Sequence, residues 1–120
     1  MAQTKTKEEL VRMAWCTALR QYPDRQCHGM SRDAGGKVCA LILLADMTGG
    51  APLYSKRPMR NAIDYPTIAA RAGLSPEQSQ KIIQANDWGK KPYTPGKKQA
   101  PNPLTFAEIA AEIEGWFASK

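Results

Sequence analysis

The apolar run at residues 38–47 is the feature that most constrains what this chain can fold into. Its first eight residues, Val-Cys-Ala-Leu-Ile-Leu-Leu-Ala, are apolar without a break, so no face of the segment can be left in water. The run is much shorter than the ~20 residues that cross a bilayer, and we expect no membrane span. Its Leu and Ala content and the glycines that follow it favour a buried helix over a strand. The other elements must therefore cover this helix on all sides.

Local signals predict further helices around it. Ser or Thr followed three residues later by Glu or Gln predicts helix starts at Thr6, Ser75 and Thr105. A proline at the start and a glycine at the end predict a short helix between Pro66 and Gly73. Behind Thr105, an apolar stripe with helical spacing gives the clearest amphipathic helix of the chain.

The remaining segments carry turn and loop signals. Asp33-Ala34-Gly35-Gly36 is typical of a tight turn and allows one small β-hairpin. Residues 51–65 read as a basic loop, and residues 89–104, with four prolines and four lysines, read as a flexible basic insertion.

Together, these patterns predict a single, mainly α domain over residues 1–120, a compact bundle of about five helices. The residues expected in its core are Trp15, Leu19, Leu41, Leu44, Ile82, Ile109, Ile113 and Trp116.

The basic charge of the chain is unevenly distributed. Residues 54–104 hold nine Lys and Arg against three acidic residues. This excess of six positive charges equals the net charge of +6 of the whole chain. Such a region attracts phosphate backbones or an acidic protein face, although the same charge also suits a surface that only keeps the protein soluble.

Residues 68–83 resemble a helix-turn-helix of the repressor type, in which small residues space two crossed helices. Ser79 stands where such motifs normally bury an aliphatic side chain, and an ordinary helical corner is the alternative. We expect Gln78, Ser79, Gln80 and Lys81 on the exposed face of the second helix.

Aromatic residues accompany the lysines of the insertion. Trp88 and Tyr93 beside these lysines suit stacking on nucleic-acid bases or contact with an anionic protein, while Trp88 packing under the loop is the alternative. The candidate contact residues for nucleic acid or a partner are Lys56, Arg57, Arg60, Gln78, Gln80, Lys81, Trp88, Lys90, Lys91, Tyr93, Lys97 and Lys98.

The sulfur and imidazole groups give little sign of chemistry. Cys16, Cys27, His28 and Cys39 lack the close ligand pairs of structural zinc sites, and we expect no metal and no cofactor. Cys27 and His28 are adjacent but have no glycine elbow or oxyanion nest nearby, so we do not expect an enzyme. Three cysteines without a CxxC pair, and a charged N-terminus, suit the cytoplasm.

Several short motifs taken together resemble a family of small, functionally uncharacterised bacteriophage and prophage proteins. These motifs lie at residues 15–19, 37–41, 73–78, 86–89 and 105–110, and relative to that pattern residues 90–104 are inserted. The resemblance implies a mobile-element context and a non-enzymatic accessory role. We therefore expect a small basic protein that binds nucleic acid or a nucleic-acid-handling complex. The alternative is an inhibitor of a host defence system, similar to an anti-CRISPR factor, that binds a host protein or ribonucleoprotein.

Overall fold

The computed structural model of the 120-residue chain describes residues 5–28, 32–50, 63–89 and 102–118. These residues form five α-helices, which confirms the predicted mainly α bundle. None of these helices is both long and apolar enough to cross a bilayer. The elements are α1 Lys7–Gln21, the 3-10 helix η1 Pro23–Arg25, α2 Ala40–Met47, α3 Tyr65–Ala70, α4 Pro76–Asp87 and α5 Phe106–Trp116.

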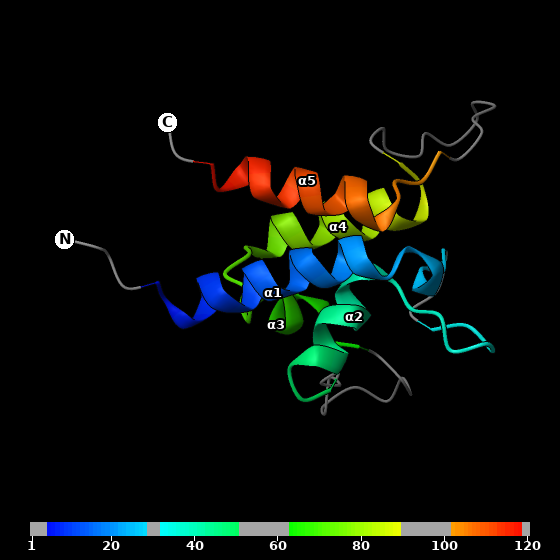
Figure 1. The fold of residues 1–120 in the computed structure, drawn as a ribbon, viewed down its shortest axis with the longest axis horizontal. Helices are drawn as coiled ribbons and strands as arrows, with labels where there is room; N and C mark the ends of the chain where they lie inside the picture. The colour runs from blue at the N-terminus through cyan, green and yellow to red at the C-terminus, as the bar shows by residue number, and fades with distance from the viewer. Residues whose placement is uncertain (1–4, 29–31, 51–62, 90–101, 119–120) are drawn as a thin grey trace.

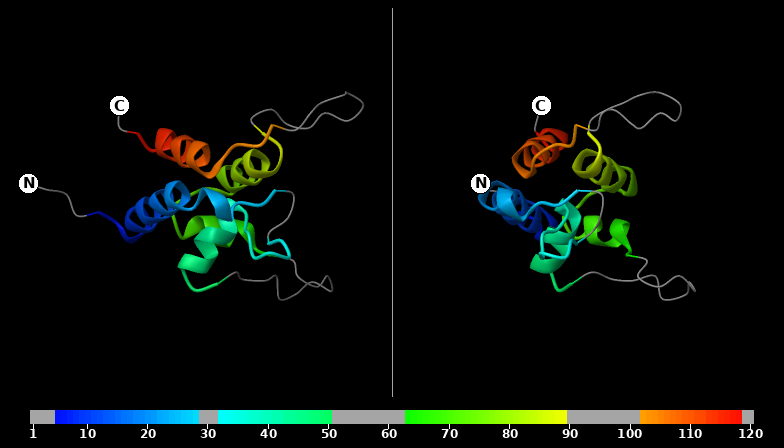
Figure 2. Two further views of the ribbon diagram at one scale, coloured as in Figure 1. Left: turned by 45° about the vertical axis from the view of Figure 1, so that its right-hand side comes forward. Right: turned by 90° about the vertical axis from the view of Figure 1, so that its right-hand side faces the viewer.

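The helices pack in two layers. Helices α1 and α5 lie side by side and run in opposite directions (Figure 1). In the end-on view, α4 and α5 form one layer, and α1, α2 and α3 form the other (Figure 2). All side chains of α2 from residue 40 to 45 are buried, as expected for a segment that is apolar on every face.

The predicted core is largely confirmed. Seven of the eight expected side chains are fully or almost fully buried, at 0–1% exposure. The exception is Trp116, which is only partly buried at the end of α5. Tyr22 continues the apolar stripe of α1 in the sequence, but it lies beyond the helix end and is 47% exposed.

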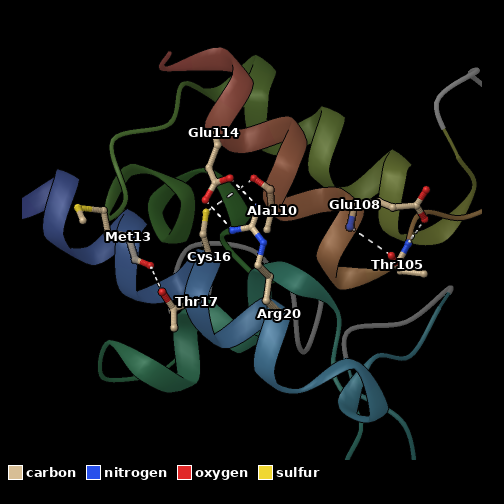
Figure 3. A network of polar contacts seen from close by, with 8 residues as sticks. All are labelled: Met13, Cys16, Thr17, Arg20, Thr105, Glu108, Ala110 and Glu114. Carbon is tan, nitrogen blue, oxygen red and sulfur yellow. Dashed lines mark hydrogen bonds and ion pairs between the residues drawn. The ribbon is translucent and has the colours of Figure 1, made fainter. Parts of the chain in front are cut away.

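The predicted helix starts are observed with their hydrogen bonds. Thr6 Oγ1 accepts a hydrogen bond from the amide of Glu9 at the start of α1. The Ser75 and Thr105 starts are full capping boxes, in which the side chain three residues later bonds back to the amide of the capping residue. Figure 3 shows the second of these boxes, between Thr105 and Glu108.

The predicted hairpin is reduced to its turn. Asp33 Oδ1 accepts hydrogen bonds from the amides of Gly35 and Lys37, which holds the turn closed. Val38 forms an isolated antiparallel bridge with Arg32 and a parallel one with Gln26. Residues 29–31, which include part of the expected first strand, lie outside the described residues.

A buried side-chain amide near the end of α4 joins four parts of the chain. Asn86 is fully buried, and its Oδ1 accepts hydrogen bonds from Gln26 Nε2 at 3.0 Å and from the Ala40 amide at 3.2 Å. Its Nδ2 donates to the Cys27 carbonyl at 2.9 Å. Gln26 extends the network to the start of α5, because its Oε1 accepts from the Phe106 amide.

Polar contacts also bridge α1 and α5 on the surface. Arg20 forms two hydrogen bonds of 2.6 Å with the carboxylate of Glu114 (Figure 3). The guanidinium lowers the pKa of Glu114 below its ordinary value. Both side chains are exposed, so this ion pair orients the two helices but adds little to stability.

Two glycines with positive φ provide a test of the packing beside α4. A Cβ added at Gly89 would come within 2.6 Å of the Asn102 carbonyl oxygen, whereas one added at Gly36 would meet nothing within 4 Å. Gly36→Ala should cost only backbone strain, about 1–2 kcal/mol. Gly89→Ala should cost at least about 2 kcal/mol more, because residue 102 must also move away from α4. Urea unfolding of both variants measures the difference, and equal losses would contradict the close approach.

Candidate nucleic-acid interface

The described residues do not carry the basic excess of the chain. They include all eleven acidic residues but only nine of the seventeen Lys and Arg, a net charge of −2. The sequence segments 51–62 and 90–101 together hold seven basic residues and no acidic one. The chain therefore divides into a weakly acidic helical body and two segments in which every charged residue is basic.

Most of the predicted contact residues belong to those two segments. Lys56, Arg57, Arg60, Lys90, Lys91, Tyr93, Lys97 and Lys98 lie outside the described residues. The structure places the other four, Gln78, Gln80, Lys81 and Trp88, on or directly after α4. The residues that flank each basic segment are also described.

The two ends of the 90–101 segment are fastened together against α4. The Trp88 carbonyl accepts a hydrogen bond of 2.7 Å from the Asn102 amide, and the Ala85 carbonyl accepts one of 2.8 Å from the Leu104 amide. Gly89, with φ +136°, permits this close approach. Four lysines are thus inserted between two neighbouring points of the helical body.

The 51–62 segment is fastened at its start by an arginine. Arg71 Nη1 donates to the Gly50 carbonyl at 2.7 Å and to Thr48 Oγ1 at 3.0 Å, just beyond the C-terminus of α2. A cation at this end of a helix is favoured by the helix dipole. Arg71 is therefore a structural residue, although it contributes to the basic tally of the sequence.

Helices α3 and α4 form the corner that the sequence suggested. The turn between them contains Gly73 at φ +80°, and Ala69 and Leu74 beside it are buried. The prediction for Ser79 was wrong, because its side chain is fully buried and its hydroxyl donates to the Pro76 carbonyl at 2.8 Å. A serine can occupy this position because its one strong donor is satisfied within the helix.

The expected exposed face of α4 is smaller than predicted. Gln78 is partly buried, and its Oε1 accepts from the Ser75 amide at 2.8 Å, so its side chain caps the helix. Gln80 and Lys81 are exposed as predicted. Trp88 is partly buried and its amide closes the end of α4.

Lys81 lies beside a groove between α4 and α5 that the sequence did not indicate. The groove has a volume of about 350 Å³, and Ile82, Ala85, Leu104 and Ile109 give it an apolar lining. Trp116 lines it as well, and Lys81 Nζ lies 6.0 Å from the centroid of the Trp116 ring. The sequence pattern placed Trp116 in the core, whereas in the structure it is partly buried, packs against the core and also lines this groove.

The cysteines lie in buried surroundings that keep them protonated. Burial raises the pKa of Cys16 and of Cys39 to about 11, and it also raises the pKa of Cys27. Asp87 adds to the increase at Cys27 and Cys39, whereas Glu114 acts on Cys16. Cys16 thus lies in a different environment from the other two.

His28 is held by the backbone of α4. Its Nδ1 lies 2.6 Å from the Asn86 carbonyl oxygen, which indicates a proton on Nδ1. Across residues 5–28, 32–50, 63–89 and 102–118, no three His, Cys, Asp or Glu side chains are grouped to hold a metal ion.

Comparisons with family models, with curated proteins and with solved structures found no match to this chain.

Thiol labelling tests the described cysteine environments. At pH 8 a thiol with the ordinary pKa of 9.0 is about one-tenth ionised, while a pKa of about 11 leaves about one-thousandth. Cys16 and Cys39 should therefore react with a disulfide reagent at least about a hundredfold more slowly in the native protein than in urea. The labelling rate of the native protein should rise as the pH approaches about 11, because the thiols then ionise. The native state holds these protons more tightly than the unfolded state, so the stability they contribute below pH 9.0 is lost as the pH rises through about 11. A thiol that reacts as fast in the native state as in urea would contradict this environment.

Proposed function

We propose that this chain is a small, basic, non-enzymatic binding protein that engages nucleic acid or a nucleic-acid-handling complex. The observation that carries the proposal is the separation of charge between a helical body of net charge −2 and two acid-free basic segments. Phosphate backbones attract such segments strongly, because binding releases condensed counterions. The acidic body disfavours phosphate elsewhere, which directs a nucleic acid to the segments.

The attachment of the 90–101 segment supports the same proposal. The hydrogen bond from Asn102 to Trp88 joins the residues that flank it, so the sequence segment with the four lysines is attached to the body beside the end of α4. Lys81 on the same helix adds an exposed cation. The candidate surface therefore combines Lys81, Trp88 and the lysines inserted between Gly89 and Asn102.

The proposed context is a bacteriophage or prophage, and the proposed compartment is the cytoplasm. The resemblance of the motifs at residues 15–19, 37–41 and 86–89 supports the first of these. The raised pKa of Cys27 argues against nucleophilic chemistry by this thiol, because a protonated thiol is a poor nucleophile.

An inhibitor of a host defence system that binds protein is the second candidate. Exposed apolar side chains on α1 and at its end favour it, since Leu10 and Met13 are 54% and 51% exposed and Tyr22 is 47% exposed. Tyr22 and Met47 line a shallow groove between α1 and α2. Such a surface suits a protein partner better than a phosphate backbone.

The salt dependence of DNA binding tests the first candidate. Replacement of Lys90, Lys91, Lys97 and Lys98 by Gln should weaken binding to a labelled duplex and reduce the slope of log Kd against log salt by about 3–4, at about 0.9 per lost phosphate contact. Fluorescence anisotropy between ~50 and ~200 mM salt measures both effects, over a range in which several phosphate contacts change affinity by orders of magnitude.

A second variant with the same net charge is the matched control. Lys5, Lys7, Arg25 and Lys37 are exposed on the helical body, and their replacement by Gln removes four charges that belong neither to α4 nor to the 90–101 segment. This control should keep most of the salt slope of the unmodified protein. Equal losses in both variants would indicate a general charge effect and contradict the assignment to residues 90–98. A chain that ignores DNA but co-purifies with one host complex would support the second candidate instead.

A further inference from the structure

The groove between α4 and α5 has the composition of a site for a flat, partly apolar ligand. Ile82, Ala85 and Ile109 line it from the two helices, and Leu104 lines it from the segment that precedes α5. Its volume of about 350 Å³ lies within the ~300–1,000 Å³ typical of small-molecule sites. The groove is thus large enough to admit a single ring system.

Trp116 provides an aromatic surface in this groove. The ring packs against the core and is only partly buried, so it has a fixed position and an accessible side. Lys81 Nζ lies over this ring, 6.0 Å from its centroid, and places a cation there. A nucleotide offers the complementary pair of features, a π-face that can stack on the ring and a phosphate that can pair with the cation.

The charges around the groove indicate which part of a nucleotide would enter. Glu112 lines the groove and repels a phosphate from its own part of it. Lys81 also lines the groove and, being exposed, attracts a phosphate there. A base inside the groove with its backbone on the Lys81 side satisfies both charges.

We propose that this groove is a stacking site for one unpaired base of a single-stranded nucleic acid, with the base on Trp116 and a flanking phosphate at Lys81. This inference rests on the proposed function and adds a preference to it. Bases in a duplex are stacked and paired, and their removal from the stack costs a few kcal/mol. The protein should therefore bind single strands more tightly than a duplex of the same sequence.

The anchoring of the groove supports a preformed site. Gln84 Nε2 donates to the Gly89 carbonyl at 3.1 Å, and the Leu104 amide donates to the Ala85 carbonyl at 2.8 Å. These bonds hold the end of α4 and the start of α5 at a set spacing. A base can then enter without a rearrangement of the helices, which limits the entropy lost on binding.

The test uses the full chain and labelled 12-nucleotide probes, as single-stranded DNA, single-stranded RNA and duplex DNA of one sequence. Anisotropy should show tighter binding of the single strands by about tenfold or more, and the two single-strand arms show whether DNA or RNA is preferred. Trp116→Ala should weaken single-strand binding by about 5- to 150-fold and leave duplex binding unchanged. Trp116→Phe should restore most of the loss, because it retains an aromatic face.

Phe117→Ala, directly after the end of the same helix, is the matched control. Phe117 does not line the groove and lies under the guanidinium of Arg12, 3.7 Å from the ring centroid, so its loss should not change binding. Ala85→Leu fills the groove without removing an aromatic residue. It therefore tests the groove as the stacking site even if Trp116→Ala fails to fold. It should weaken single-strand binding as Trp116→Ala does.

The possible failures are distinguishable. Tight single-strand binding that neither Trp116→Ala nor Ala85→Leu changes would overturn the groove as the stacking site and leave the proposed function intact. Equal affinity for duplex and single strands would do the same. A chain that binds none of the three probes at ~50 mM salt would overturn direct nucleic-acid binding, the part of the proposed function on which this inference rests.

Discussion

The arrangement of this protein depends on the hydrogen bonds of one buried carboxamide. Asn86 is fully buried near the end of α4, and it bonds to Gln26, to the Cys27 carbonyl and to the Ala40 amide at the start of α2. A buried polar group of this kind is costly unless it is satisfied, and no buried side-chain N or O atom of the described residues lacks a partner. The surrounding segments are placed so that both the oxygen and the nitrogen of this carboxamide have partners.

The network also sets the geometry of the candidate surface. Gln26 Nε2 donates to the Leu104 carbonyl at 2.7 Å, so the same side chain that contacts Asn86 also holds the segment before α5. Leu104 in turn lines the groove and bonds to α4. Asn86 is thus connected through hydrogen bonds to the groove. The same bonds connect it to the contact between Trp88 and Asn102, the residues that flank the 90–101 segment. A chain of only 120 residues gains a defined spacing of two helices in this way.

The parts of the fold that local chemistry determines could be predicted from the sequence. Capping residues such as Ser75 and Thr105 act within one helical turn, and the apolar run around Leu41 can only be buried. The polar residues were harder to place, because three partners of the Asn86 side chain, Gln26, Cys27 and Ala40, stand 46 to 60 positions away in the sequence. Ser79 was expected on the surface for a different reason: its partner, the Pro76 carbonyl, is only three positions away, but the polarity of a serine gives no sign that it is buried.

The candidate site shows the same division. The basic segments are evident from composition, whereas the groove requires Trp116 of α5 and Lys81 of α4 to meet, which no local pattern encodes.

The most direct test of the central role of Asn86 is a double-mutant cycle in urea unfolding with Gln26→Ala, Asn86→Ala and the double variant. Each single change should lower the free energy of unfolding by about 2 kcal/mol or more, with a coupling of at least about 1 kcal/mol between them. Small losses that add within about 0.3 kcal/mol would show that the two side chains act independently and would contradict the central role of Asn86.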